Sequence, residues 1–188
     1  MSSKKIVVID TETNWNDKVM SIGAAIADSE SWKLIGTRYY ILTPECNRGG
    51  MFSDVMEISG VKADLKASRS NVLNDLKSVL KSNDISSVFA YNAVFDYKHL
   101  PELSEYKWYD IMKIAAYKQF NKAISPQAEC CGTGKLKRDY GVEPIMRLLS
   151  GNKSYFEVHN ALCDAVDELK IVQLLGQKFE IYKNAEIN

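Results

Sequence analysis

The chain has 188 residues, a length typical of one domain with a substantial core, and we expect a single domain over residues 1–188. Its 46% hydrophobic and 26% charged residues are ordinary for a globular protein, and no apolar run approaches a membrane span, so a cytoplasmic protein with no membrane association is expected. The formal net charge of zero argues against a large sequence-independent nucleic-acid footprint.

The cysteines indicate reduced thiols rather than a zinc or redox centre. Adjacent Cys130 and Cys131 cannot supply the Cys-x-x-Cys spacing of a zinc knuckle. Only His99 and His159 are present to add imidazole ligands. A structural zinc site is therefore disfavoured.

Three strands are predicted in the first part of the chain. Ile6–Ile9 is a run of β-branched apolar residues, typical of a strand buried on both faces. The next two strands are expected at Val19–Ala27, whose small residues permit close packing, and at Trp32–Leu42. Because the connections between the strands are short, they are expected to form an antiparallel meander.

The middle of the chain alternates between helix and strand. Apolar residues at helical spacing predict an amphipathic helix over Asn71–Leu80, with Ser70 as its N-cap. The apolar run Ile85–Tyr91 predicts a strand parallel to the first, because a helix leads into it. A short helix perturbed by proline at Phe95–Leu103 and an edge strand at Trp108–Asp110 are expected to follow.

The last third of the chain is predicted to be mostly helical. Helices are expected at residues 111–120, 135–140, 144–149 and 160–176, with residues 121–134 as the least ordered stretch. Taken together, the elements predict an α/β fold. Its mixed five-stranded sheet has three antiparallel and then two parallel strands, and helices flank it.

Acidic side chains follow two predicted strands that lie side by side. Asp10 and Glu12 are two positions apart on the first strand, so they point to the same face and need protons, bonding partners or a cation there. Asp96 follows the strand at Ile85–Tyr91 and is expected at the same sheet end, with capping of the next helix as its alternative role. Oxygen ligands of this kind select Mg²⁺ or Mn²⁺.

The last long helix is predicted to bring a histidine and a further aspartate. His159 projects from the preceding loop, and Asp164 points inward from the first turns of the helix. Ala161 and Ala165 lack bulk, which lets the helix backbone approach the sheet and the short Asp164 side chain reach a shared cation. The alternatives are a hydrogen-bonding histidine at a helix start and a solvated aspartate, but Asp164 has apolar neighbours on the helix.

These three motifs together resemble those of the DEDDh family, whose members are similar to the proofreading ε subunit of bacterial DNA polymerase III, RNase T and oligoribonuclease. The matching segments are Asp10-Thr11-Glu12, Asn92-x-x-Phe95-Asp96 and His159-x-Ala161-x-x-Asp164-Ala165. They stand in the family's order and span nearly the whole chain. The histidine in the third motif points to the histidine branch of the family.

The resemblance implies a ribonuclease H-like fold and hydrolysis of single strands from the 3′ end to nucleoside 5′-monophosphates. Asp10, Glu12, Asp96 and Asp164 match the family's ligands for two Mg²⁺ or Mn²⁺ ions, and His159 matches its general base. Two cations about 4 Å apart hold a scissile phosphate between them. An imidazole with an ordinary pKa near 6.5 accepts a proton at neutral pH.

The resemblance also implies contacts with the terminal nucleotide. The residues that match such contacts are Thr11, Thr13, Ser59, Asn92 and Phe95. Two segments depart from the family pattern: Asn14-Trp15 stands where Thr-Gly is common, and Ser59 replaces the histidine of the family's His-Gly-Ile segment. Phe95 has the alternative role of a core aromatic residue.

Three functions stay open. The favoured one is an exonuclease on single-stranded DNA, free-standing or associated with a polymerase or another replication or repair protein. An exoribonuclease is the alternative, because the groups that would sense a 2′-hydroxyl are not identified. A catalytically silent interaction module predicts the loss of at least one ligand, and all of them are present. A dinucleotide-binding protein is disfavoured, since no Gly-x-Gly-x-x-Gly follows the first strand.

Residues 113–153 form a locally basic segment, with eight basic and three acidic side chains. Two interpretations stay open for it. The segment is either a solvated surface or a rim that tracks phosphates near the acidic site.

Overall fold

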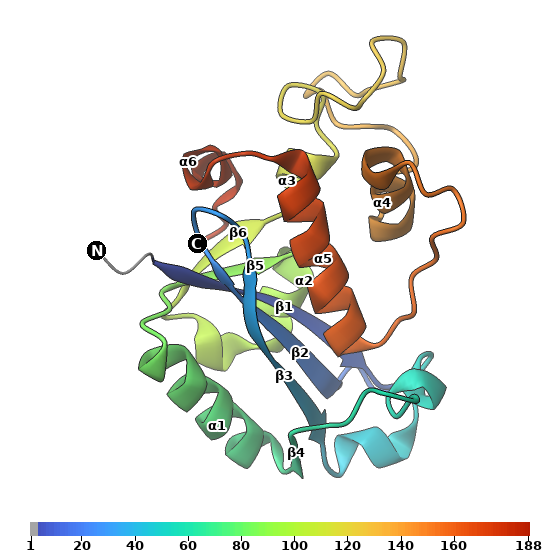
Figure 1. Ribbon diagram of the computed structural model, residues 1–188. Helices are drawn as coiled ribbons and strands as arrows, with labels where there is room; N and C mark the ends of the chain where they lie inside the picture. Colours follow the sequence, from blue (N-terminus) through green and yellow to red (C-terminus); the bar gives the residue numbers. More distant parts are fainter. Residues whose placement is uncertain (1–3) are drawn as a thin grey trace.

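The computed structural model describes residues 4–188, which form one mixed β-sheet with helices on both of its faces (Figure 1). The strands are β1 (Lys5–Thr13), β2 (Val19–Asp28), β3 (Leu34–Leu42), β4 (Leu65–Ala67), β5 (Ser87–Ala90) and β6 (Lys107–Asp110). The helices are α1 (Arg69–Ser82), α2 (Val94–His99), α3 (Met112–Ala115), α4 (Val142–Ser150), α5 (Ala161–Leu175) and α6 (Phe179–Tyr182). None of the helices in this range has the length and apolar character needed to cross a membrane.

The sheet confirms the predicted topology and adds one strand. Its order is β4-β3-β2-β1-β5-β6, with β1, β2 and β3 antiparallel and with β5 and β6 parallel to β1. The expected number of strands is wrong by one, because β4 pairs in parallel with Tyr40–Leu42 of β3. The sequence of β4 has no run of β-branched residues that would predict a strand. It is anchored instead by Asp64, whose carboxylate accepts a hydrogen bond from the Tyr39 backbone N–H at 2.8 Å.

The helix around residue 112 is shorter than predicted because the side chain of Asn121 ends it. The predicted helix over residues 111–120 is reduced to α3. Asn121 Nδ2 donates a hydrogen bond to the Ala115 carbonyl oxygen at 2.6 Å, which takes a backbone acceptor that the next helical turn would need.

The predicted helix over residues 135–140 is wrong. Lys135 and Leu136 form isolated β-bridges with Tyr117 and Cys130, so tertiary pairing holds this stretch extended. A smaller correction concerns α1, which begins two residues earlier than expected and is capped by Ser68 rather than by Ser70.

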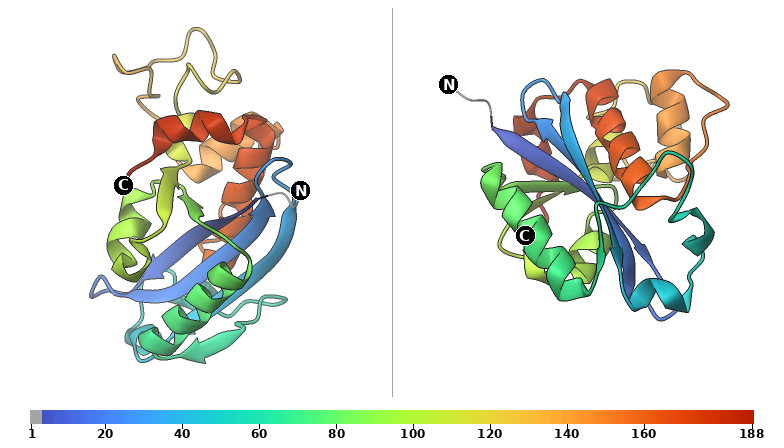
Figure 2. Two further views of the ribbon diagram at one scale, coloured as in Figure 1. Left: turned by 90° about the vertical axis from the view of Figure 1, so that its left-hand side faces the viewer. Right: turned by 60° about the horizontal axis from the view of Figure 1, so that its bottom comes forward.

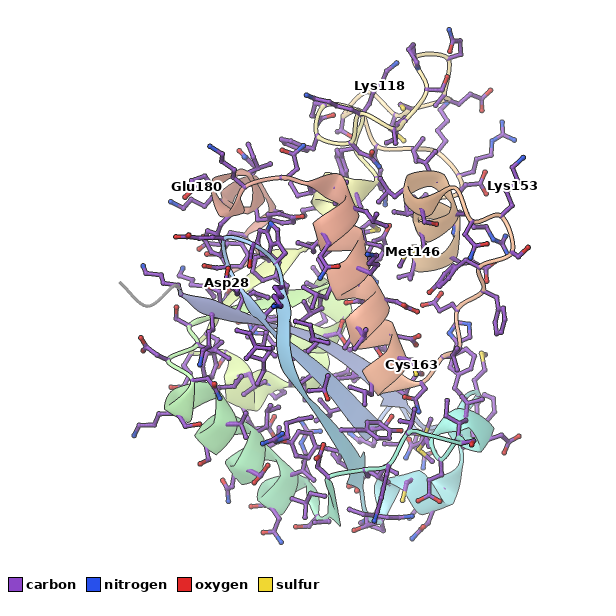
Figure 3. The ribbon with its side chains drawn as sticks, in the orientation of Figure 1. Asp28, Lys118, Met146, Lys153, Cys163 and Glu180 are labelled. Carbon is purple, nitrogen blue, oxygen red and sulfur yellow. The ribbon has the colours of Figure 1, made fainter. Side chains whose placement is uncertain are left out.

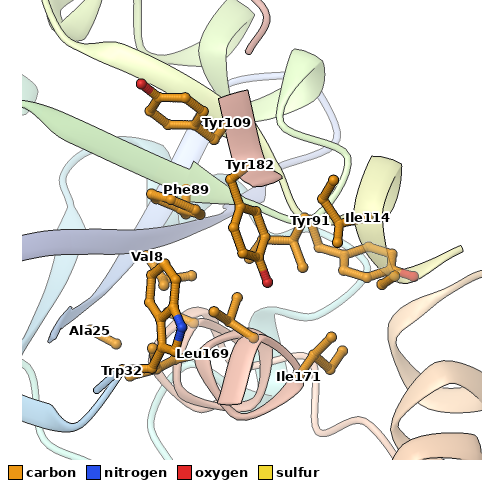
Figure 4. Close-up of a cluster of buried hydrophobic side chains, with 14 of the residues drawn as sticks. Val8, Ala25, Trp32, Phe89, Tyr91, Tyr109, Ile114, Leu169, Ile171 and Tyr182 are labelled. Carbon is orange, nitrogen blue, oxygen red and sulfur yellow. The ribbon is translucent and has the colours of Figure 1, made fainter. Parts of the chain in front are cut away.

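The two faces of β1 bury different layers of the core. Val7 and Ile9 pack with residues of α1 on one face. Ile6 and Val8 face the other way, into the cluster that holds Leu169 of α5 (Figure 4). Figure 2 shows α1 and α5 on opposite faces of the sheet. Because side chains alternate along a strand, Asp10 and Glu12 continue the series that faces α5.

Helix α5 approaches the sheet most closely at its N-terminal end. A Cβ atom on Gly23 of β2 would lie 1.9 Å from the backbone oxygen of Ala161. Gly23 is also the residue that pairs with Asp10 across the β1–β2 ladder. Ala161 and Ala165 are fully buried at this contact, as expected from their small size. The missing side chain of Gly23 therefore brings the start of α5 directly over Asp10.

We expect the substitution Gly23→Ala to destabilise the protein, because the added methyl group meets rigid backbone rather than a flexible side chain. Overpacking of this kind costs about 1–3 kcal/mol, and more where the neighbouring backbone cannot move. Thermal unfolding followed by circular dichroism would measure the loss as a lower Tm.

Gly36→Ala in β3 is the matched control, because none of the described atoms considered at this position lies within 4 Å of its added Cβ. Its Tm should stay close to that of the wild type. Equal Tm values for the two variants would contradict the close contact between α5 and β2.

Candidate active site

The end of β1 presents two carboxylates to the α5 side of the sheet. Burial raises the pKa of Asp10 well above its ordinary value, and the nearby charges of Glu168, Asp96, Asp164 and Glu12 raise it further. Among the described residues, Asp10 Oδ2 is buried and has no hydrogen-bond partner. Burial raises the pKa of Glu12 to about 8, with Asp164 as the strongest neighbouring charge. Ionised, both side chains would be unstable here without a positive charge.

The turn between β5 and α2 delivers a third carboxylate. Asn92 adopts the left-handed conformation at φ 61°, and its backbone N–H donates to the Asp110 carboxylate at 3.1 Å. This turn places Asp96, which is 2% exposed, within 2.7 Å of the Thr11 hydroxyl that donates to it. Burial raises the pKa of Asp96 to about 7, although the hydrogen bond from Thr11 acts in the opposite direction.

Asn160 anchors the start of α5. Its side-chain oxygen accepts hydrogen bonds from the backbone N–H groups of Leu162 and Cys163, which caps the helix. Its Nδ2 donates to the carbonyl oxygens of Val55 and Met56, at 2.8 and 3.2 Å. One side chain thus fastens the helix end to the loop that follows β3.

The same helix end carries a histidine and the fourth carboxylate. Glu12, His159 and Asp164 each offer one ligand atom, and these atoms lie within 4.8 Å of one another. Asp164 is 2% exposed, and its Oδ1 is buried without a hydrogen-bond partner in residues 4–188. Burial raises the pKa of Asp164 to about 8, and Glu157 is the strongest neighbouring charge.

His159 is held by its backbone and by an aromatic ring. Its backbone is left-handed at φ 59°, which is uncommon for a residue other than glycine. The imidazole stacks on Phe52, with ring centroids 4.0 Å apart and planes inclined by 14°. Burial lowers the pKa of His159, which favours the neutral imidazole.

The residues predicted as metal ligands and base come together at one end of the sheet. Glu12, His159 and Asp164 form the tight group, whereas Asp10 and Asp96 lie just outside it as close electrostatic neighbours. The buried oxygens of Asp10 and Asp164 that have no partner among the described residues fit the ligand needs of a hard divalent cation.

The predicted substrate contacts fall into two groups. Thr11 is buried and donates to Asp96, so it positions a carboxylate rather than facing a ligand. Thr13 is half-buried, whereas Ser59 and Asn92 are exposed. Phe95 is 39% exposed and its ring lies 4.3 Å from the His99 ring, which rules out a fully buried core position.

Sequence reasoning missed two residues of the site, Glu168 and Phe52. Glu168 is 2% exposed, and its Oε2 accepts a hydrogen bond from the Tyr91 backbone N–H at 2.9 Å. Its position one helical turn after Asp164, on the same helix face, is a signal that the sequence contains. Phe52 has no such signal, because only the folded loop brings it to His159.

The loop in the first part of the basic segment lies away from these carboxylates. Gln177, just beyond the C-terminal end of α5, donates to the Phe120 carbonyl oxygen at 2.6 Å, which places this loop at the opposite end of that helix. In Figure 3, Lys118 lies near the upper end of the molecule and Cys163 at the lower end of α5. Within this segment Arg138 pairs with Glu129 and Arg147 with Glu143, at 2.7 and 2.8 Å. For this loop the geometry favours the interpretation as a solvated surface, whereas Glu143 of the same segment is close enough for its charge to act on His159.

The raised carboxyl pKa values predict that the metal-free protein loses stability as pH rises. Folded Glu12 and Asp164 titrate at about 8 and Asp96 at about 7, whereas unfolded carboxyl groups titrate at about 4. The folded state therefore binds more protons between these values, and its extra stability is fully present below the unfolded pKa and is lost as pH rises through 7–8. In chelator, Tm should fall between about pH 5.5 and about pH 8.5.

The control for this experiment is Glu12→Gln, which removes one of the titrating groups and should flatten the pH dependence of Tm. Mn²⁺ should raise the Tm of the wild type most at the higher pH. A Tm in chelator that rises over the same interval would contradict the burial of these carboxylates as ionisable groups.

Comparison with known proteins gives matches in structure only: no protein-family model and no curated protein sequence matches this chain. Exonuclease X in complex with 5′ overhanging duplex DNA has a TM-score of 0.60 at 18% identity, over 96% of this chain and 98% of that chain. The nuclease domain of 3′hExo, a DEDDh family member bound to rAMP, has a TM-score of 0.64 at 15% identity, over 100% and 96%.

E. coli Exonuclease I in complex with a dT13 oligonucleotide has a TM-score of 0.64 at 13% identity. The match covers 97% of this chain but 43% of that protein, so this chain corresponds to less than half of Exonuclease I. The mixed sheet with its flanking helices has the predicted arrangement, with one strand more than expected. The chain has the fold of these solved exonucleases, which is the ribonuclease H-like fold that was predicted.

Proposed function

We propose that this chain is a divalent-cation-dependent 3′-to-5′ exonuclease of the DEDDh family, acting on single strands. The observation that carries the proposal is the meeting of Asp10, Glu12, Asp96, His159 and Asp164 at one end of the sheet. The fold supports it, because proteins named as exonucleases share this architecture at nearly full coverage.

The carboxylates of Asp10, Glu12, Asp96 and Asp164 would hold the cations. When bound, two Mg²⁺ or Mn²⁺ ions supply Lewis-acid activation of the attacking water and charge stabilisation at the phosphate. The negative charge of the four carboxylates matches the positive charge of the two ions. The protein's own contribution is a rigid set of oxygens, because Thr11 fixes Asp96 and the close contact at Gly23 fixes the helix of Asp164.

His159 is the general base in this proposal. The imidazole must be neutral to accept a proton from the attacking water at a ring nitrogen, and burial lowers its pKa in that direction. The Phe52 ring restricts the imidazole to one plane, and the left-handed backbone aims it at the carboxylates. Both features keep the base in place before substrate binds.

Single-stranded DNA is the favoured substrate, and RNA is the alternative. Exonuclease X and Exonuclease I are similar proteins whose structures contain DNA, whereas 3′hExo is bound to a ribonucleotide. The acidic end of the sheet is compatible with DNA and with RNA as the substrate, since both present a phosphate to the bound cations. A polymerase or other replication or repair protein is a candidate partner, and the silent interaction module is the third function.

We expect the wild type with Mn²⁺ or Mg²⁺ to shorten a 5′-labelled single strand from its 3′ end, giving a ladder and nucleoside 5′-monophosphates. Asp10→Ala should abolish hydrolysis because it removes a cation ligand. His159→Ala should slow hydrolysis about 10²–10⁴-fold, the usual contribution of a general base. Gel electrophoresis of the labelled products measures both effects.

Glu180→Gln, on the exposed surface of α6, is the control variant and should keep the wild-type rate. Calorimetric titration with Mn²⁺ separates the roles: His159→Ala should bind Mn²⁺ nearly as the wild type does. Loss of Mn²⁺ binding in His159→Ala would make the imidazole a ligand instead. Absence of mononucleotides from every strand, despite bound Mn²⁺, would favour the interaction module.

Matched DNA and RNA strands of one sequence should differ in their rates of hydrolysis, with DNA degraded faster. The comparison is made at equal strand and cation concentrations, with kcat/KM as the measured quantity. A higher kcat/KM for the RNA strand would assign the chain to the exoribonucleases while leaving the cation site and the base unchanged.

A further inference from the structure

Glu168 is a buried acid that the proposed mechanism leaves without a role. It lies on α5 one turn after Asp164 and is 2% exposed. A buried carboxyl group is costly unless something in its surroundings uses it. Two observations, one on hydrogen bonding and one on charge, connect it to the cation site.

The first observation is the hydrogen bond from the Tyr91 backbone N–H to Glu168 Oε2, at 2.9 Å and buried. Tyr91 directly precedes Asn92, whose left-handed backbone turns the chain from β5 into α2 and so delivers Asp96. Glu168 therefore links the helix that carries Asp164 to the turn that carries Asp96. The link joins two ligands that lie 68 positions apart in the sequence.

The second observation is the electrostatic interaction between Glu168 and the ligand carboxylates. Of the neighbouring charges that act on Asp10, that of Glu168 is the strongest, ahead of those of Asp96 and Asp164. Burial raises the pKa of Glu168 well above its ordinary value, and the charges of Asp96 and Asp164 raise it further. The Glu168 side chain is thus close to the ligand carboxylates.

We propose that Glu168 is a positioning residue of the cation site: its carboxyl group holds the Asp96 turn against α5 through the Tyr91 N–H. The inference rests on the proposed function, since it concerns the same site. Residues that support metal ligands in this way change affinity by about 10- to 100-fold when replaced.

Two substitutions separate the charge from the hydrogen bond. Glu168→Gln removes the charge and keeps an oxygen that can accept from the Tyr91 N–H, whereas Glu168→Leu removes both. Asn121→Leu is the matched control. Asn121 is also buried and its side chain bonds backbone groups, donating to the Ala115 carbonyl oxygen at 2.6 Å and accepting from the Ala123 N–H at 3.0 Å. It lies next to Phe120, at the other end of α5 from the carboxylates.

The experiment measures Mn²⁺ binding by titration calorimetry, together with the Tm in chelator and kcat on single-stranded DNA. Glu168→Leu should bind Mn²⁺ about 10-fold or more weakly and also lose kcat, because the Asp96 turn is released. Glu168→Gln should restore most of the affinity and of kcat, because its amide oxygen still accepts the Tyr91 N–H. Asn121→Leu should bind Mn²⁺ as the wild type does, even where its Tm in chelator is lower.

Each of these measurements has an outcome that would contradict the proposed role of Glu168. Wild-type Mn²⁺ affinity in Glu168→Leu would overturn the positioning role, and so would a Glu168→Gln variant that binds Mn²⁺ as weakly as Glu168→Leu. Equal losses of Mn²⁺ affinity in Asn121→Leu and Glu168→Leu would make Glu168 a structural residue only. If the wild type itself binds no Mn²⁺, the proposed function fails as well, so the two failures are distinguishable.

Discussion

The contact between the backbone of Ala161 and Gly23 is the constraint on which the rest of the site depends. Any side chain at Gly23 would push the start of α5 away from the sheet, since a Cβ there would already lie 1.9 Å from the Ala161 oxygen. Gly23 pairs with Asp10, so the helix end arrives over the carboxylates of β1. An aspartate side chain is short, and only this close approach lets Asp164 share a site with Glu12.

The second feature is the concentration of negative charge that this contact creates. Asp10, Glu12, Asp96, Asp164 and Glu168 all have raised pKa values, with burial as the main cause for each. Such an arrangement opposes folding when its groups ionise, and the core clusters on both faces of the sheet must offset that cost. Carboxyl groups with raised pKa values that gather at one end of a sheet are typical of functional sites, where polar groups are arranged for a ligand rather than for the fold.

Regular elements and loops contribute differently to the site. The carboxylates stand on β1, α2 and α5, whereas Phe52 and the carbonyl groups bonded by Asn160 belong to the loop after β3. Asn160 joins the two by capping α5 and holding that loop with one side chain. The orientation of His159 therefore depends on a loop that this polar junction fastens to the scaffold.

Local patterns in the sequence were sufficient for the sheet topology and for α5. Apolar runs and helical spacing are properties of neighbouring residues and do not depend on tertiary context. The five residues from Asp10 to Asp164 that meet at the site were found through the resemblance of the three motifs to those of the DEDDh family. The parts that were not predicted are held by hydrogen bonds and strand pairings between residues outside the local pattern. These parts are β4, the end of α3, and the extended stretch near Leu136.

The sequence by itself determined which groups are the candidates for the chemistry, because the three motifs supply carboxylates and an imidazole. Only the tertiary structure decided how they are supported: that Thr11 holds Asp96, that Phe52 stacks on His159, and that Glu168 bonds the Tyr91 N–H. The physical reason is that hydrogen bonds, ring stacking and electrostatic interactions depend on distances in space. Residues far apart in the sequence acquire those distances only when the chain has folded.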